Sequence, residues 1–287
     1  MDVFVNLTLS GLSTGMMIFL VASGLSLIFG LMGVLNFAHG SLFMWGAYAG
    51  VWVFARTHSF TLALLAGMAA GAMVGWVMER LTIRRIYGNV VAQILITTGV
   101  MLVLNELLSA TFGPNIIATT VPPLLAGSWA FGNIVVVKYR VFTIVVGFLV
   151  ALAVHFMLSR TRVGIIVRAG VENQEMVQVL GINIRQVFSL VFVFGSALAA
   201  LGGVMMAPAI GAVNSGMGIE NQMLAFIVVV IGGMGSFLGS ALGSVIVGLA
   251  GAYTAWFFPE ASLAVNVVLM ALVLLLKPNG LFGMGGE

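Results

Sequence analysis

The sequence predicts an all-α, polytopic helical membrane protein with about eight or nine transmembrane segments. Of its 287 residues, 61% are hydrophobic and only 7% are charged, and the mean hydropathy is +1.20. Soluble proteins carry about 25% charged residues, so this composition excludes that class. Several apolar runs reach or exceed the ~20 residues that cross a bilayer core. No series of short alternating segments indicates a transmembrane β-barrel.

Nine apolar runs, separated by polar or glycine-rich residues, define the predicted spans. The first run follows no basic segment and is too long for a cleaved signal peptide, so we expect it to be retained. The seventh run is short and is either a full span or a re-entrant segment. Because long extramembrane stretches are absent, residues 1–287 are expected to form a single transmembrane domain. The runs lie near 9–35, 40–55, 60–81, 91–112, 141–159, 186–209, 222–235, 238–257 and 262–276.

Basic residues predict the orientation of these spans. Eight of the eleven lie after the third, fifth and ninth runs, at Arg80, Arg84, Arg85, Arg160, Arg162, Arg168, Arg185 and Lys277. These connections fall on one side of the membrane, and the positive-inside bias makes that side cytoplasmic. The N-terminus is then external. The net charge of +3 reflects these orientation signals and not a nucleic-acid-binding surface.

The longest external stretch is 113–140. Turn signals at Gly113-Pro114-Asn115 and Pro122-Pro123 bracket short β-prone runs such as Ile134–Val137. This stretch is either a plain connector or a docking surface for an external partner.

A polar break interrupts the apolar sequence between the first and second runs. Asn36, His39 and Ser41 fall within six residues of one another, and Gly33 and Gly40 lie beside them. In hydrocarbon each polar group needs a partner, and the glycines permit a bend or a close helix approach. The predicted topology places this break near the inner face. It is either a tight cytoplasmic turn or a broken helix beside a permeation path.

A second glycine-rich break follows the seventh run, at Gly232, Gly233 and Gly235. Gly235, Gly239 and Gly243 recur every four residues, which favours close helix contact. A phosphate-binding loop would need a GK[ST] ending that is missing here. Paired interrupted segments in the two halves of a chain are typical of a transporter's central pathway, although sequence identity between these two is low.

The loop 159–187 is too long for a turn and too polar to enter the membrane. Within it, 172–180 is predicted to form a short amphipathic helix with Met176, Val177 and Leu180 on its apolar edge. Gly181 suits the left-handed position that ends such a helix. The edge packs either against the protein's own spans or into a groove on a separate cytoplasmic subunit.

The remaining polar residues do not form a reaction centre. Glu106 is expected near an outer helix end and Glu220 in a loop. Other polar residues in or beside the spans are Asn105, Asn221, Gln222 and Asn266. No His, Asp and Glu cluster has metal-ligand spacing, and no nucleophile is paired with a base. The chain has no cysteine, which excludes disulfides and thiol chemistry. We therefore expect a protein without metal or cofactor that is not an enzyme.

Four ordered stretches carry a family resemblance over nearly the whole chain: NFAHGSLFMWGAY, RTRVGIIVRAGVENQEMVQVLGIN, GGMGSFLGSALGS and LLLKPNGLFG. They resemble the smaller, LivH-like permeases of the branched-chain amino acid ABC importers. The resemblance implies a type II ABC importer-like permease in the bacterial inner membrane. It also implies a heterodimer with a LivM-like permease, two cytoplasmic ATPases and a periplasmic solute-binding protein.

The same resemblance implies that 160–185 is a cytoplasmic coupling loop inserted into an ATPase. Gly164, Arg168, Glu172 and Gly181 carry over to that role by motif position. One departure is that Met176 and Val177 stand where the family often has alanine. Since the chain lacks a Walker motif, the energy for transport must come from a partner.

An ABC importer permease is therefore the favoured function. The alternatives are an ion- or proton-driven carrier or channel, and an intramembrane enzyme or assembly scaffold. Within the family the cargo is a branched-chain amino acid, another amino acid, urea or a short amide, and nothing in the sequence separates these.

Overall fold

Nine helices correspond one to one with the nine predicted spans, which confirms the helical membrane fold. The computed structural model describes residues 2–131, 134–262 and 264–283. Six of these helices (α1, α3, α4, α5, α8 and α10) are long and apolar enough to cross a bilayer. The nine are α1 (Asp2–Met32), α2 (His39–Thr57), α3 (Phe60–Leu81), α4 (Val90–Phe112), α5 (Lys138–Arg160), α8 (Ile184–Ile210), α9 (Met217–Gly232), α10 (Phe237–Phe257) and α11 (Val265–Leu276).

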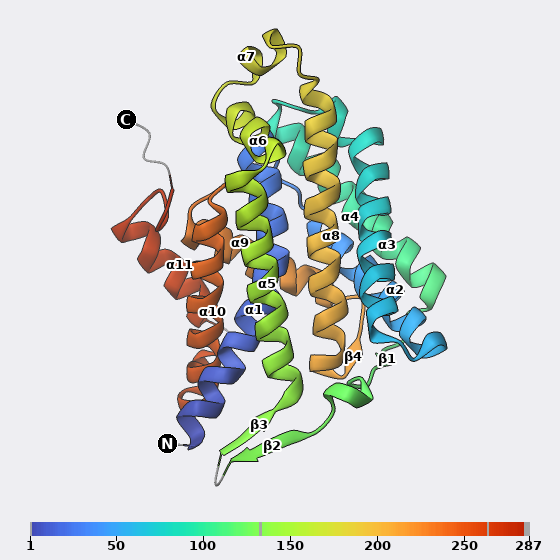
Figure 1. Cartoon of the computed structure of the whole chain (residues 1–287), viewed down its shortest axis with the longest axis vertical. Coiled ribbons are helices and arrows are strands. Elements are labelled where there is room, and N and C mark those ends of the chain that lie inside the picture. Colours follow the sequence, from blue (N-terminus) through green and yellow to red (C-terminus); the bar gives the residue numbers. More distant parts are fainter. Residues whose placement is uncertain (1, 132–133, 263, 284–287) are drawn as a thin grey trace.

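The described helices alternate in direction as the topology requires. Two further helices, α6 (Arg162–Glu172) and α7 (Gln174–Val179), lie together at one end of the molecule, as Figure 1 shows. The positive-inside argument makes this the inner end. Short 3₁₀ turns occur at Ile83–Arg85, Pro123–Leu125 and Pro259–Ala261.

Helices α1 and α8 form the centre of the bundle. Both are apolar around their whole circumference, as expected for helices surrounded by protein. Their most apolar windows are 78% and 67% buried, against 11% for α4 and 17% for α5. The outer helices therefore present most of their surface away from this chain.

Small residues allow the helices to approach closely. On α3, Gly67, Gly71 and Gly75 lie one above another and contact α8 at Val204, Ala200 and Ser196. At the α1–α8 crossing the two backbones themselves meet, because a Cβ on Gly24 would lie 2.2 Å from the carbonyl oxygen of Gly195. The predicted face on α10 also packs closely: Gly239 and Gly243 lie against Gly232 of α9.

The outer end carries the few strands of the described residues. The strand β1 (Ile117–Ala118) pairs antiparallel with β4 (Ala212–Val213), and β2 (Ser128–Phe131) pairs with β3 (Ile134–Val137). The β-prone run at 134–137 is therefore confirmed as a strand. The β1–β4 pair fastens the long external connection to the turn between α8 and α9 (Figure 1).

Helix α9 resolves the uncertainty about the seventh run. It is only 16 residues long, yet it keeps the alternation of directions, because α10 packs antiparallel to α1 with Gly248 against Gly11 and Gly235 against Gly30. Its last carbonyls are capped by the C-terminal segment. The backbone N–H groups of Leu281 and Phe282 donate to the carbonyls of Ile231 and Gly232, each at 2.9 Å.

The close α1–α8 crossing predicts a sharp difference between two glycine substitutions. Gly24→Ala forces two backbones apart, and we expect it to lower the free energy of unfolding by about 1–3 kcal/mol. Gly99→Ala on α4 meets no atom within 4 Å and replaces a helical glycine, so it is expected to be neutral or slightly stabilising. Thermal unfolding of both variants in detergent tests this; equal melting temperatures would contradict it.

Candidate functional site

The first polar break is an extended segment that runs back into the bundle. After α1 ends at Met32, Gly33 takes a positive φ of 60°, and α2 does not begin until His39. The N–H of Leu35 donates to Gln93 Oε1 (3.3 Å) and that of Phe37 to Thr97 Oγ1 (3.1 Å), both on α4. The two donors lie two residues apart, ~6.6 Å in an extended chain, and the two acceptors lie four residues apart, ~6 Å along a helix. The spacing of the donors therefore matches that of the acceptors.

The start of α2 is completed by α9. Ala38 precedes α2 and has no side chain that caps it. Instead Gln222 Oε1 accepts the N–H of Gly40 at 2.7 Å, which satisfies one of the free donors of the first turn. A Cβ on Gly40 would lie 2.2 Å from the carbonyl oxygen of Gly218. The expected roles of Gly33 in a bend and of Gly40 in close helix approach are both confirmed.

All three polar side chains of the break are buried. His39 Nε2 donates to the Val21 carbonyl at 3.0 Å, and Ser41 Oγ donates to Asn105 Oδ1 at 3.0 Å. Asn36 Oδ1 accepts the N–H of Ala38 at 3.0 Å. Among the described residues, Asn36 Nδ2 and His39 Nδ1 have no hydrogen-bond partner. Hydrogen bonds therefore hold the break in place, but not every buried polar atom in it has a partner among the described residues.

The break lies deeper than the sequence suggested. Val21, the partner of His39, precedes the last residue of α1 by eleven residues, which is ~16 Å of helix. The expectation of a break near the inner face, and with it the tight-turn alternative, was wrong. Residues 33–36 are non-helical and 37–38 form a turn, and this connection returns the chain to mid-bundle before α2 starts.

The second break is a short glycine turn at the inner end. Gly233 and Gly235 have φ values of 100° and 83°, which side-chain-bearing residues rarely adopt. Gly232 lies against Gly239, and Gly235 lies against Gly30 near the end of α1. The aromatic ring of Phe37, in the first break, packs 5.2 Å from that of Phe226 on α9. Helix α9 thus contacts the first break and ends at the second.

In the inner loop, two of the expected site residues fix α6 to the end of α5. A Cβ on Gly164 would lie 2.1 Å from the carbonyl oxygen of Leu158, so only glycine fits there. The Arg168 guanidinium donates to the same carbonyl, near the C-terminus of α5 where a cation is favoured. Both contacts orient the loop within this chain.

The predicted helix at 172–180 is in part wrong. Glu172 ends α6, and Asn173 caps the shorter α7 by accepting the N–H of Met176 at 2.9 Å. The side chain of Glu172 lies outside the described part of the chain. Gly181 has a φ of 81° and terminates α7 as predicted. The sequence pattern missed α6 because its cap, Thr161, follows directly on the basic end of α5.

The apolar edge of α7 points mainly away from the bundle. Val177 is buried, whereas Met176, Leu180 and also Val179 are 57%, 71% and 81% exposed. Of the two alternatives for the edge formed by Met176, Val177 and Leu180, packing against the protein's own spans therefore holds for Val177 alone. Val177 anchors a short helix whose other apolar side chains have no cover in this chain.

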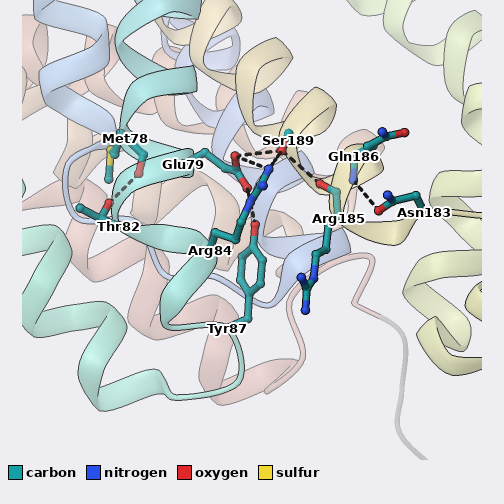
Figure 2. Close-up of polar contacts among 9 residues, drawn as sticks. All are labelled: Met78, Glu79, Thr82, Arg84, Tyr87, Asn183, Arg185, Gln186 and Ser189. Atoms are coloured by element: carbon teal, nitrogen blue, oxygen red, sulfur yellow. Dashed lines mark hydrogen bonds and ion pairs between the residues drawn. The ribbon is translucent and has the colours of Figure 1, made fainter.

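A buried polar cluster near the inner end escaped the sequence reading altogether. Glu79, in the last turn of α3, is fully buried and accepts hydrogen bonds from Arg84, Tyr87 Oη and Ser189 Oγ, as Figure 2 shows. Burial and the bond to Glu79 raise the pKa of the Tyr87 phenol above its ordinary value. Ser189 belongs to α8, so the cluster joins two helices. The only signal in the sequence was an acid beside a group of arginines.

The other polar residues lie apart from these sites. Glu220 is in the first turn of α9 and not in a loop, while Asn221 and Gln222 beside it are buried. Glu106 is exposed on α4, next to the Asn105 that accepts from Ser41. Within the described residues no group of three His, Asp or Glu side chains is placed to hold a metal ion.

Known proteins that are similar in sequence to this chain are transport permeases. Residues 7–276 match the family described as branched-chain amino acid transport system permease component. The high-affinity branched-chain amino acid transport permease BraD of Pseudomonas aeruginosa is 33% identical, with 96% of this chain and 94% of BraD covered. The corresponding LivH of Escherichia coli K12 is 32% identical over 98% of this chain and 96% of LivH.

The bonds that hold the first break predict different effects for two neighbouring threonines on α4. Thr97→Val removes the acceptor of the Phe37 N–H, and an unsatisfied buried donor costs about 1–3 kcal/mol. We expect a lower melting temperature and reduced uptake. Thr98 Oγ1 bonds only the Ile94 carbonyl of its own helix, so Thr98→Val is expected to behave like the parent protein. Equal behaviour of the two variants would show that α4 does not support the break.

Proposed function

The chain belongs to the family of permease components of branched-chain amino acid transport systems, and we propose that it forms half of an ATP-driven translocation pathway. The family match extends over almost the whole chain, and the relatives cover it end to end. In this proposal a LivM-like permease supplies the other half. The pathway imports branched-chain amino acids across a bacterial inner membrane.

We propose that the inner loop couples this pathway to two cytoplasmic ATPases. The observation that carries this step is α7, which displays Met176, Val179 and Leu180 to the cytoplasmic side with nothing over them. Apolar side chains exposed on a short, anchored helix are typical of a helix that docks into a partner's groove. Gly164 and Arg168 hold α6 on α5, Gly181 ends α7, and Glu172 lies between them, so the loop 160–185 is presented as a unit.

The first break is proposed to act as the wall of the pathway or as its gate. Burial of Asn36, His39 and Ser41 favours a role in bracing the break over direct contact with cargo. Two of their polar atoms lack partners, and such groups are rare in a settled interior. A second arrangement that supplies those partners would therefore be close in free energy. Gly232, Gly233 and Gly235 provide the matching turn on α9 and α10.

Two further surfaces of the chain are proposed to contact partners or the pathway. Helix α4 carries the exposed Glu106 six residues before its outer end, and a charge in a span favours a protein or water-filled neighbour over lipid. We therefore assign this face to the pathway or to the second permease. The external connection between α4 and α5, with Leu124 92% exposed, is the proposed contact for a periplasmic binding protein.

Reconstitution tests the whole proposal. Co-expression with its partner ATPases, permease and binding protein should yield a complex that is stable in detergent. Once reconstituted in sealed vesicles, this complex should accumulate a branched-chain amino acid only when ATP is supplied. Accumulation by vesicles that hold this polypeptide alone would refute it and favour a secondary carrier.

Two matched variants test the coupling assignment. Val179→Asp places a charge on the exposed edge of α7, and we expect ATPase association to weaken about tenfold or more, ~1.4 kcal/mol. Leu124→Asp makes the same chemical change at the outer end and should leave ATPase association unchanged. Pull-down of the ATPase from solubilised membranes measures both. Wild-type association of the Val179→Asp variant would remove α7 from the interface.

A further inference from the structure

We propose that the Glu79 cluster is a transmission joint that makes the inner ends of α3 and α8 move together when the coupling loop moves. This rests on the proposed coupling of the loop to an ATPase. Here the cluster means Glu79, Arg84, Tyr87 and Ser189. It would make Glu79 a positioning residue for transport, although it belongs neither to the breaks nor to the loop.

The loop leads directly into the cluster. Helix α7 ends at Val179 and α8 begins at Ile184, where Asn183 Oδ1 accepts the N–H of Gln186 at 3.4 Å as the cap. Ser189 lies in the second turn of α8. A displacement of α7 therefore reaches Ser189 through a short, turned connection and a capped helix, with little chain in between to absorb it.

Ser189 connects α8 to the inner end of α3. The Ser189 hydroxyl donates to Glu79 Oε2 at 2.8 Å and accepts from Arg84 Nη2 at 2.7 Å. Arg84 also bonds both oxygens of Glu79 at 3.3 Å, and Tyr87 Oη donates to Oε1 at 2.8 Å (Figure 2). One serine thus contacts both members of the ion pair and joins them to α8.

Burial makes this joint stiff. The Glu79 side chain is completely shielded while the Arg84 side chain is 37% exposed, so the carboxylate depends on these donors for its solvation. Separating α3 from α8 would remove the Ser189 donor from a buried charge, which is unfavourable. The ring of Tyr87 also packs edge-on against Phe188 of α8 at 5.2 Å. The positive charge of Arg185 acts to lower the pKa of Tyr87, against the larger effect of burial. Arg185 makes no ion pair among the described residues.

Beyond the cluster, α3 and α8 remain in close contact toward the outer end. The stripe formed by Gly75, Gly71 and Gly67 lies against Ser196, Ala200 and Val204. Helix α2 lies against the same part of α8, because a Cβ on Gly46 would be 2.4 Å from Ala200. Helices α2, α3 and α8 therefore form one packed body. This body links the inner loop to α2, which starts where the first break ends.

The test compares amino acid uptake with ATP hydrolysis in the reconstituted complex. Glu79→Gln keeps the shape but removes the charge, and we expect uptake per ATP hydrolysed to fall about fivefold, with ATPase association unchanged. Ser189→Ala removes the link between α8 and Glu79, together with a bond to the Arg185 carbonyl of its own helix, and should lower the same ratio about twofold or more. Ser189→Thr, which keeps the hydroxyl, should restore it.

Thr82→Val is the matched control. Thr82 lies beside the cluster, but its hydroxyl donates only to Met78 of its own helix at 2.6 Å (Figure 2). Its ratio of uptake to hydrolysis should equal that of the parent. A purely structural role would lower the yield of complex without changing the ratio.

The outcomes separate the two proposals. If Ser189→Ala assembles and keeps the parental ratio, the joint is refuted whether or not Glu79→Gln folds. If the parent complex shows no ATP-dependent uptake, the proposed function itself fails, and that result does not depend on any variant.

Discussion

The structure depends on the rule that backbone N–H and C=O groups in hydrocarbon must find partners within the protein. A regular helix meets this rule by itself, but the non-helical segment 33–38, which ends in a turn at 37–38, does not. It is possible here only because Gln93 and Thr97 stand on α4 at a spacing that matches two extended residues, and because Gln222 reaches the start of α2 from α9. Side chains of two other helices thus replace the bonds that an unbroken helix would make.

Close helix packing follows from a second constraint. Apolar attraction cannot hold helices together in lipid, so contact area must come from near approach of backbones. Glycines supply it at Gly24 and Gly195 and along the α3 stripe. These contacts place α2, α3 and α8 in one packed body that meets α1 through α8, while α4 and α5 remain mostly uncovered. The broken segment lies between the tightly packed part and the uncovered α4.

The sequence was sufficient for features set by local composition. The nine apolar runs, the strand at 134–137, the bend at Gly33 and the end of α7 at Gly181 all depend on nearby residues. The depth of the first break was not predictable in this way, because it depends on bonds to α1, α4 and α9, far away in the chain. The Glu79 cluster was missed for the same reason. Its acid and arginines looked like an orientation signal until folding brought Ser189 beside them.

The capping of α9 by the C-terminal segment has a consequence for biogenesis. The carbonyls of Ile231 and Gly232 acquire their partners only when Leu281 and Phe282 arrive, after α10 and α11 have been synthesised. During translation the inner end of α9 is therefore exposed as an unfinished helix terminus. Its final seating is therefore a late event, and a released chain truncated just before Leu281 would keep all nine bundle helices but leave this terminus uncapped.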